Sequence, residues 1–174
     1  MKKRSLQELH RVSVEQFKQQ PKIPVVVILD NIRSMHNVGS VFRTADAFAI
    51  DKIYLCGITA CPPNKEINKT ALGATESVTW EYQEDALVLI KKLQQEQYKV
   101  FAAEQTDKSV LLPDLCLHPD EKIALILGNE VFGVDDRLLP SLDGAIEIPQ
   151  FGTKHSLNVS VAAGIILWHL SQIR

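Results

Sequence analysis

Residues 146–163 read IEIPQFGTKHSLNVSVAA, which predicts a strand end, a loop and the start of a helix. Ala145 to Ile148 is predicted as a last strand, and Pro149 and Gly152 shape a loop after it. Ser156 can cap a helix, and Ser156 to Ile173 has the apolar middle of a long terminal helix. Taken alone, the stretch also fits a capped amphipathic helix with no binding role.

Strands and helices are predicted to alternate along the rest of the chain. The apolar run Val25 to Leu29 is continuous, which is typical of a strand buried on both faces of a parallel sheet. Further strands are predicted at Lys52–Cys56, Val78–Tyr82, Lys99–Ala103 and Lys122–Leu127, and helices at Ser5–Gln20, Asn37–Phe48, Lys69–Leu72, Glu84–Gln97 and Val134–Leu139. This alternation predicts an α/β domain with a mainly parallel sheet flanked by helices.

The composition excludes several classes of protein. A length of 174 residues with 45% hydrophobic content predicts one domain with a full core, here residues 23–174 behind an N-terminal basic helix over residues 1–22. We expect a cytoplasmic protein without a membrane partner, since no apolar run has the length of a membrane span or follows the basic N-terminus as in a signal peptide. The three cysteines lack a zinc-ligand spacing, so we expect no metal site.

The charge of the chain predicts no general affinity for nucleic acid, because the net charge is -2. Residues 1–22 differ from the rest, with six Lys or Arg residues against two Glu residues. This segment is either a local RNA contact or a solvated helix face.

The glycine-rich loops of the common nucleotide-binding folds are absent. No G-x-G-x-x-G occurs, and residues 30–35 contain no glycine. Gly128 and Gly133 have the spacing of a phosphate loop, but Val134 and Asp135 stand where that loop needs Lys and Ser or Thr. Dinucleotide-binding folds, phosphate-loop NTPases and Rossmann-type methyltransferases are therefore disfavoured.

Two further polar segments follow predicted strands, where ligands bind in parallel sheets. In residues 31–48, NIRSMHNVGSVFRTADAF, Asn37 and Gly39 lie near a helix start whose free N–H groups can hold an anion, and Arg43 could grip a phosphate. In residues 124–135, ALILGNEVFGVD, a strand runs into Gly-Asn-Glu. There Gly128 would let a ligand approach the backbone, and Glu130 places a carboxylate at the strand end. Each segment alone also fits a capped helix or a tight turn.

Together the three segments resemble the three motifs of the SpoU/TrmH family of RNA 2'-O-methyltransferases, which is of the SPOUT class. The patterns are N-x-G-x-x-x-R-x-A from Asn37, L-G-N-E ending at Glu130, and I-P-x-x-G-x-x-x-S-L-N-V-S-V-A from Ile148. The stretch ALGATESV at residues 71–78 also resembles members that act on ribosomal RNA. The resemblance runs from Val25 to Leu170.

The resemblance implies a fold and a reaction. The C-terminal part of the sheet would be tied in a trefoil knot that holds S-adenosylmethionine, mainly through backbone groups. The positions matching the family's cofactor site are Gly128, Asn129, Ile148, Ser156 and Leu157. The reaction implied is methyl transfer to a ribose 2'-hydroxyl of RNA without a metal.

The resemblance also implies catalytic positions. Arg43 matches the family's essential arginine, and Asn37, Glu130, Ser156 and Asn158 match the polar positions that orient this arginine and the ribose. Two roles remain open for Arg43: a general base, or a clamp on the neighbouring phosphate that also polarises the 2'-oxygen. The clamp is favoured, because a guanidinium stays protonated in proteins and is a poor base.

Partners and departures follow from the same comparison. We expect a homodimer in which the terminal helix supplies apolar residues from among Val159, Val161, Ile165, Ile166 and Trp168, although some of these must face the chain's own core. We favour tRNA over rRNA, since only about 24 residues precede the first strand and larger relatives carry an RNA-binding domain there. Gln150, Lys154 and His155 depart from the family pattern and could contact RNA. The main alternative is a non-catalytic RNA-binding or ribosome-assembly factor that keeps the knot.

Overall fold

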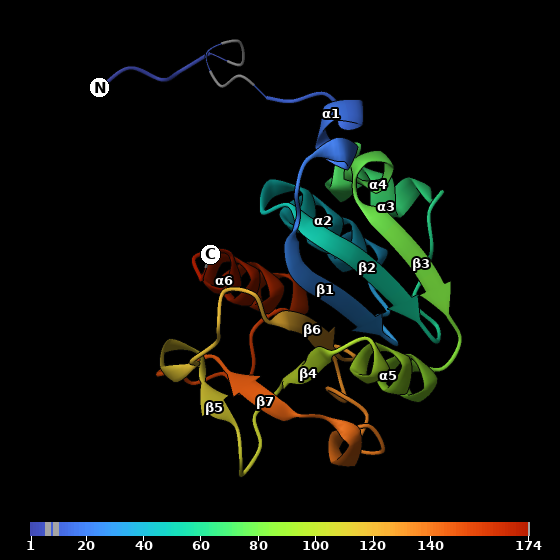
Figure 1. The fold of residues 1–174 in the computed structure, drawn as a ribbon, viewed down its shortest axis with the longest axis vertical. Helices are drawn as coiled ribbons and strands as arrows, with labels where there is room; N and C mark the ends of the chain where they lie inside the picture. The colour runs from blue at the N-terminus through green and yellow to red at the C-terminus, as the bar shows by residue number, and fades with distance from the viewer. Residues whose placement is uncertain (6–7, 9–10, 174) are drawn as a thin grey trace.

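Seven strands form a single sheet in the computed structural model, which describes residues 1–5, 8 and 11–173. The strands are β1 (Ile23–Asp30), β2 (Ile50–Cys56), β3 (Thr79–Gln83), β4 (Tyr98–Ala103), β5 (Val110–Leu111), β6 (Lys122–Leu127) and β7 (Gly144–Glu147). Their order is β3-β2-β1-β6-β4-β7-β5, and every neighbouring pair is parallel (Figure 1). The predicted parallel α/β sheet is confirmed, and all carboxyl ends lie at one edge.

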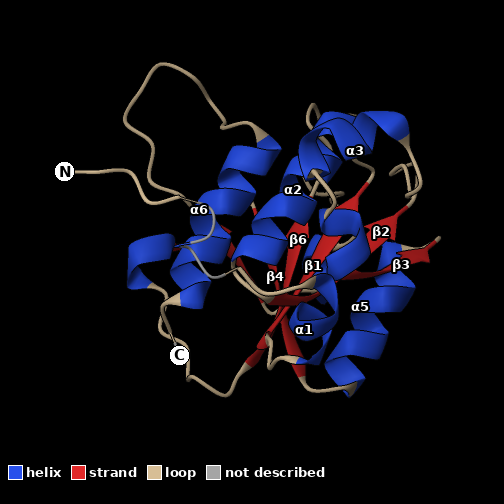
Figure 2. Cartoon of the chain, turned by 90° about the horizontal axis from the view of Figure 1, so that it is seen from above, coloured by secondary structure: helices blue, strands red, loops and turns tan. Residues whose placement is uncertain are grey.

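Helices cover both faces of this sheet (Figure 2). The helices are α1 (Val14–Gln19), α2 (Met35–Ala47), α3 (Lys65–Ala71), α4 (Ala74–Ser77), α5 (Ala86–Gln95) and α6 (Val159–Ser171), with the short 3-10 helices η2 (Leu112–Asp114) and η3 (Leu139–Ser141). Helices α2 and α6 pack together on one face, and α5 covers the other. None of the helices in the described ranges is long and apolar enough to span a membrane.

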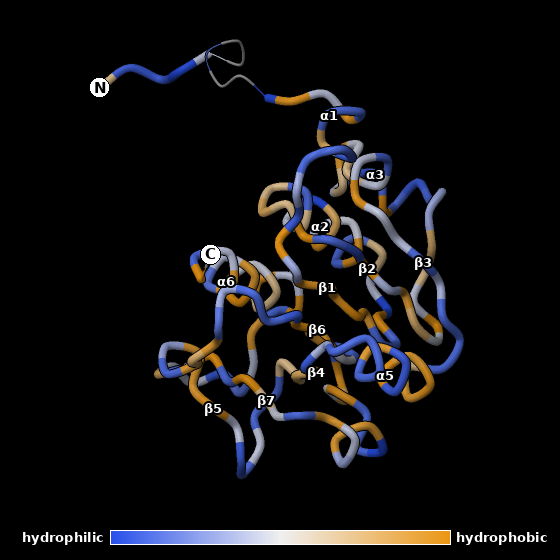
Figure 3. Tube along the Cα trace, in the orientation of Figure 1, coloured by the Kyte–Doolittle hydropathy of each residue, from blue (hydrophilic) through white to orange (hydrophobic). Residues whose placement is uncertain are grey.

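The central strand β1 is buried on both faces, as its continuous apolar run predicts. Val27 and Leu29 join the core under α2 and α6, while Val26 and Ile28 join the core under α5. Figure 3 shows hydrophobic residues concentrated in β1 and in its neighbour β6. Burying each such side chain stabilises the fold by roughly 1.5–3 kcal/mol, so this double-sided core fixes the position of the strand ends.

Three predicted helices after the N-terminal one differ clearly from the structure. The helix predicted over Val134–Leu139 is wrong: a turn leads into the 3-10 helix η3, where Pro140 cannot donate the backbone hydrogen bond of an α-helix. The helix predicted over Lys69–Leu72 is part of α3, which begins at Lys65 and ends where Leu72 takes a left-handed conformation (φ 49°). The terminal helix begins at Val159 rather than at Ser156.

The N-terminal helix is shorter than the predicted range Ser5–Gln20. Helix α1 begins at Val14 because Ser13 and Gln16 form a reciprocal capping box. Leu6 and Leu9, which belonged to the predicted apolar pattern, lie outside the described residues. The division of the chain into residues 1–22 and 23–174 stays a prediction.

The two-residue edge strand β5 was not predicted, because a strand of two residues carries no detectable alternation. It pairs with β7 and completes the sheet. The trefoil knot also stays a prediction, since strand order alone does not define how the last segment threads.

Candidate functional site

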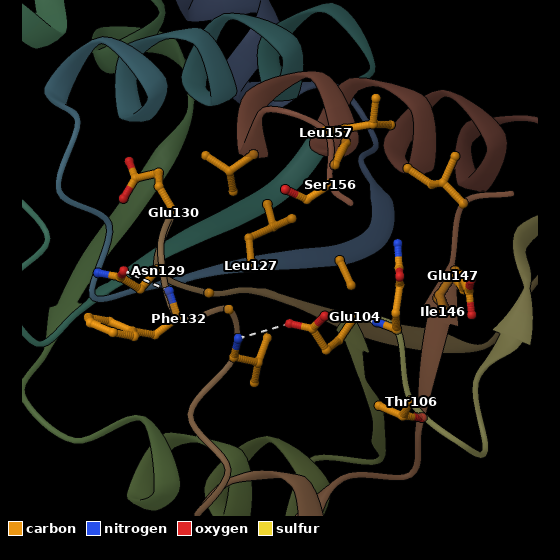
Figure 4. Close-up of a pocket in the computed structure, with 18 of the residues that line it drawn as sticks. Glu104, Thr106, Leu127, Asn129, Glu130, Phe132, Ile146, Glu147, Ser156 and Leu157 are labelled. Atoms are coloured by element: carbon orange, nitrogen blue, oxygen red, sulfur yellow. Dashed lines mark hydrogen bonds between the residues drawn. The ribbon is translucent and has the colours of Figure 1, made fainter. Parts of the chain in front are cut away.

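A cavity of about 610 Å³ opens at the carboxyl ends of β4, β6 and β7, the edge where ligands bind in parallel sheets. We call it the β6 cavity. All five residues predicted to bind a cofactor line it, namely Gly128, Asn129, Ile148, Ser156 and Leu157. Three of the five predicted catalytic residues line it: Glu130, Asn158 and Ser156, which is also one of the cofactor residues. Figure 4 shows Asn129 and Phe132 at one end of the cavity and Ile146 and Glu147 at the other.

A tight turn after β6 forms one wall of this cavity. The side-chain oxygen of Asn129 accepts hydrogen bonds from the backbone N–H groups of Val131 (2.9 Å) and Phe132 (3.2 Å). Its amide nitrogen donates to the carbonyl of Asn31 (2.8 Å), which ties the turn to the end of β1. The turn is therefore held at both ends by one side chain.

Gly128 is required by the chain's own backbone. A Cβ atom at this position would lie 2.2 Å from the carbonyl oxygen of Gly133 and 2.3 Å from the amide nitrogen of Val134. No side chain can relieve this overlap, because both neighbours are backbone atoms. Position 128 must therefore be glycine mainly because the turn closes on itself there, and the predicted close approach of a ligand is a secondary reason.

A chain of hydrogen bonds joins all three polar segments. The Glu130 carboxylate accepts from the backbone N–H groups of Arg33 and Ser34 (2.9 Å each) and from Asn37 Nδ2 (3.0 Å). Asn37 Oδ1 in turn accepts from Asn158 Nδ2 (3.1 Å). Residues that are 93 and 121 positions apart in the sequence are thus placed side by side.

Asn158 also caps the terminal helix. Its Oδ1 accepts from the backbone N–H groups of Ser160 (2.9 Å) and Val161 (3.4 Å). Ser156, which was predicted to be the cap, lies in the loop before the helix and faces the β6 cavity. Asn158 thus fixes the start of α6 and the position of Asn37 with the same side chain.

The network keeps Glu130 ionised. Partial burial raises the pKa of Glu130, but the donors from Arg33, Ser34 and Asn37 outweigh this effect and hold the pKa below its usual value of 4.5. A carboxylate at this site therefore stabilises the folded state above the unfolded-state pKa, and this stabilisation is lost as the pH falls through the lower folded-state pKa.

Glu130→Gln is expected to lower the melting temperature at pH 7 by about 2–4 °C, the equivalent of about 1 kcal/mol. The glutamine side chain carries no charge, and its N–H group would face the N–H groups that donate to the carboxylate in the wild-type protein. Because protonation of Glu130 has the same effect in the wild-type protein, the difference should vanish as the pH falls well below 4.5. Thermal melts of both proteins across this range test the expectation. A difference that persists unchanged at about pH 3 would show that the charge is not its cause.

Arg43 lies apart from the β6 cavity, on the exposed side of α2. Within the described residues its guanidinium has no hydrogen bond and no ion pair, so it is free to bind an external anion. Gly39 is buried inside α2, where a Cβ atom would lie 2.2 Å from the carbonyl of Ile67 in α3. This glycine lets two helices pack closely, and the suggestion that the helix start near Gly39 binds an anion stays a prediction.

Residues after β4 line the cavity and were not singled out from the sequence. Glu104 accepts a hydrogen bond from the backbone N–H of Val134 (3.1 Å), and Gln105 donates to the carbonyl of His155 (3.1 Å). The polar run EQTD directly follows the predicted strand Lys99–Ala103. Ligands bind beyond the carboxyl ends of parallel strands, and the same rule applied to this strand would have identified the run as part of the site.

The lining of the β6 cavity is acidic. It contains Glu104, Glu130, Asp136 and Glu147, and among the described residues no Lys, Arg or His lines it. This charge suits a cationic ligand better than a phosphate. S-adenosylmethionine carries a sulfonium and an ammonium group, so the residues fit the cofactor implied by the sequence. No group of three or more His, Cys, Asp or Glu residues suited to a metal ion occurs within the described ranges.

Comparisons with known proteins agree with this geometry. The model of the SpoU rRNA Methylase family matches residues 24–168. The 23S rRNA (guanosine-2'-O-)-methyltransferase RlmB of Neisseria meningitidis is 31% identical over 83% of this chain and 56% of its own length. The tRNA (guanosine(18)-2'-O)-methyltransferase of Thermus thermophilus is 28% identical over 96% of this chain and 84% of its own.

A solved structure gives the same result for the fold. The AdoMet-bound rRNA methyltransferase from Sinorhizobium meliloti superposes with a TM-score of 0.79 at 26% identity, covering 89% of this chain and 57% of that one. The chain thus spans little more than half the length of this structure and of the Neisseria relative. Since the family model matches most of the sequence and the three polar segments meet at one site, the chain belongs to the SpoU rRNA Methylase family.

Proposed function

We propose that this protein transfers a methyl group from S-adenosylmethionine to a ribose 2'-hydroxyl of RNA. One observation carries the proposal: the β6 cavity is joined through Glu130 and Asn158 to Asn37, which lies on the same helix as the unpaired Arg43. The hydrogen-bond network thereby connects the β6 cavity, which suits a cationic cofactor, to the helix that carries Arg43, whose unpaired side chain can bind a phosphate. The relatives named for guanosine 2'-O-methylation support the reaction class.

The chain's residues would act mainly by positioning. The transfer would move the methyl group from the cofactor's sulfonium to the ribose 2'-oxygen, and the hydroxyl proton would pass to solvent. Arg43 would bind the neighbouring phosphate and polarise the 2'-oxygen, while Glu130 and Asn158 keep α2 and α6 in register with the cavity. Alignment of this kind can supply a large part of the rate acceleration. S-adenosylmethionine, when bound by the residues that line the β6 cavity, supplies an activated methyl group.

We favour tRNA over rRNA as the substrate. The Thermus relative named for tRNA matches 96% of this chain and 84% of its own length, whereas the Neisseria relative named for rRNA is matched over 56% of its length. The chain thus resembles the tRNA enzyme over a larger share of both proteins. An RNA substrate is consistent with action in the cytoplasm.

Mapping 2'-O-methyl groups in the RNA of cells with and without the gene tests the proposal. We expect one or a few positions, in tRNA, to lose the modification and to regain it when purified protein and S-adenosylmethionine are added. RNA that binds the protein but is unchanged at every position would favour the non-catalytic assembly factor instead.

We also propose a homodimer formed through α6. Val161, Ile165 and Trp168 form an exposed apolar stripe on this helix, and Trp168 is 55% exposed. Ile166 is fully buried and belongs to the chain's own core, so it cannot contribute to the interface as expected from the sequence. An apolar stripe at this spacing is typical of a helix that packs against a partner.

Trp168→Glu is expected to convert the dimer to a monomer, because it places a charge in an apolar interface. Light scattering on the purified proteins measures the change in mass. Val88→Glu, at an exposed apolar position on α5, is the matched control and should leave the mass unchanged. A wild-type protein that is monomeric and active would refute the dimer.

A further inference from the structure

A second cavity of about 520 Å³ lies beside the β6 cavity, at the carboxyl ends of β1 and β2. We call it the Asp30 pocket. The two cavities share the turn after β6, including Asn129 and Phe132. A ligand that occupies the Asp30 pocket would therefore lie next to whatever fills the β6 cavity.

Asp30 is the buried polar group of this pocket. Its side chain is only 4% exposed, and Oδ1 accepts a hydrogen bond from Asn31 Nδ2 (3.0 Å). Within the described residues, no donor reaches Oδ2. No fully buried side-chain oxygen of these residues lacks a partner, so Oδ2 is not completely shielded from solvent, and Asp30 lines the pocket. Burial raises the pKa of Asp30, which reflects how little solvent reaches it.

The walls around Asp30 are rigid. Asn31 has a left-handed backbone conformation (φ 55°), which asparagine tolerates better than most residues. Its side-chain oxygen accepts from the backbone N–H of Ile58 (3.2 Å), and its carbonyl accepts from Asn129. The ends of β1, β2 and β6 are thus tied together around the pocket.

Two apolar residues that line the pocket are exposed. Phe132 is 85% exposed and Ile58 is 69% exposed, so neither side chain belongs to the hydrophobic core. An exposed aromatic ring beside a cavity is the arrangement on which nucleic-acid bases stack. Phe132 also lines the β6 cavity, so a base stacked there would lie close to the cofactor.

We propose that the Asp30 pocket binds the base of the methylated nucleotide and selects guanine, with Phe132 stacking on the ring and Asp30 accepting hydrogen bonds from its edge. This proposal rests on the function proposed above and adds the identity of the base. Enzymes that modify nucleic acids often take the target nucleotide out of the stack and read its Watson–Crick edge in such a pocket.

Guanine fits this pocket better than the other bases because of its donors. A carboxylate can only accept hydrogen bonds, and it can accept two side by side. Guanine offers two adjacent donors, the ring N1–H and the exocyclic 2-amino group. Adenine and cytosine offer an amino group next to a ring nitrogen that is itself an acceptor, and uracil offers one N–H between two carbonyls. Those edges would turn a lone pair toward Asp30.

The other carboxylates of the pocket do not oppose this role. Asp135 forms an ion pair with Arg137 (2.5 Å), and the positive charge of Arg137 partly offsets the repulsion between Asp135 and Asp30. Asp136 is exposed to solvent, where its charge is screened. Asp30 is therefore the carboxylate in the pocket that combines burial with an unpaired oxygen.

The test uses total RNA from cells that lack the gene, incubated with the purified protein and labelled S-adenosylmethionine, then digested to nucleosides. We expect the label in 2'-O-methylguanosine. Asp30→Asn, which keeps the acceptor for Asn31, should reduce transfer about 10-fold or more with binding of S-adenosylmethionine unchanged, and Phe132→Ala should reduce transfer by a similar factor. Asp51→Asn, at the opposite end of β2, and Val88→Ala, exposed on α5, are the matched controls and should keep full activity.

A synthetic substrate tests the donor pair directly. Replacing the target guanosine by inosine, which lacks the 2-amino group, should reduce transfer about 10-fold for the wild-type protein and by less for Asp30→Asn. Label in another nucleoside, or Asp30→Asn with full activity, would overturn the base assignment while leaving the methyltransferase proposal intact. No label in any nucleoside would refute the methyltransferase proposal and the base assignment with it.

Discussion

Arg43→Ala is expected to abolish methyl transfer while leaving the binding of S-adenosylmethionine nearly intact. The side chain lies outside the β6 cavity and has no hydrogen-bonding or ionic partner within the described residues, so its loss should disturb neither the cavity nor the fold. The RNA, in contrast, loses the cation that would hold its phosphate and polarise the 2'-oxygen. Calorimetry for the cofactor and a labelled-methyl assay for the reaction separate these effects.

Arg43→Lys distinguishes the two roles open to this residue. Lysine keeps the charge but loses the planar fork of donors. Weak remaining activity would indicate a phosphate clamp, whereas activity as low as that of Arg43→Ala would indicate that the guanidinium acts at the hydroxyl. Lys91→Ala, which removes an exposed cation from α5 on the other face of the sheet, is the control and should be fully active. A fully active Arg43→Ala protein would refute both roles.

Gly128→Ala is expected to weaken cofactor binding by at least about 100-fold. The new methyl group would meet the backbone of Gly133 and Val134 at 2.2–2.3 Å, so the turn after β6 would have to move. Overpacking of this kind typically costs about 1–3 kcal/mol of stability, and here the displaced atoms form a wall of the β6 cavity. Calorimetric titration and thermal melts measure the two effects.

Gly164→Ala is the matched control for that substitution. Gly164 lies within α6, and no atom lies within 4 Å of the position that its Cβ would take. The same change of one methyl group should therefore leave cofactor binding intact and raise stability by roughly 0.5–1 kcal/mol, since alanine favours a helix. Equal cofactor affinities for the two variants would contradict the role assigned to Gly128.

Much of the fold could be predicted from local sequence patterns. The run Val25 to Leu29 predicts a strand buried on both faces, and β1 is such a strand because it lies between β2 and β6 with helices on either side. Polar residues after strand ends predict the ligand-binding edge, and the predicted cofactor residues do line one cavity there. These features depend on periodicity and on strand direction, which neighbouring residues already encode.

Helix boundaries and glycine roles were harder to predict, because they depend on contacts distant in the sequence. Ser156 and Asn158 are both good capping residues, and only the packing of α6 against α2 selects Asn158. Gly128 and Gly39 have the same sequence appearance as ligand-binding glycines, yet both make room for another part of the backbone. Local propensity cannot distinguish these cases.

The assembly of the site was decided by the tertiary structure. The hydrogen bonds from Asn37 to Glu130 and from Asn158 to Asn37 join residues 93 and 121 positions apart, and no spacing along the chain predicts them. The unpaired oxygen of Asp30 beside the exposed ring of Phe132 is likewise a result of folding. Burial removes water from a polar group, and only the arrangement of the surrounding strands determines which groups lose water without gaining a partner.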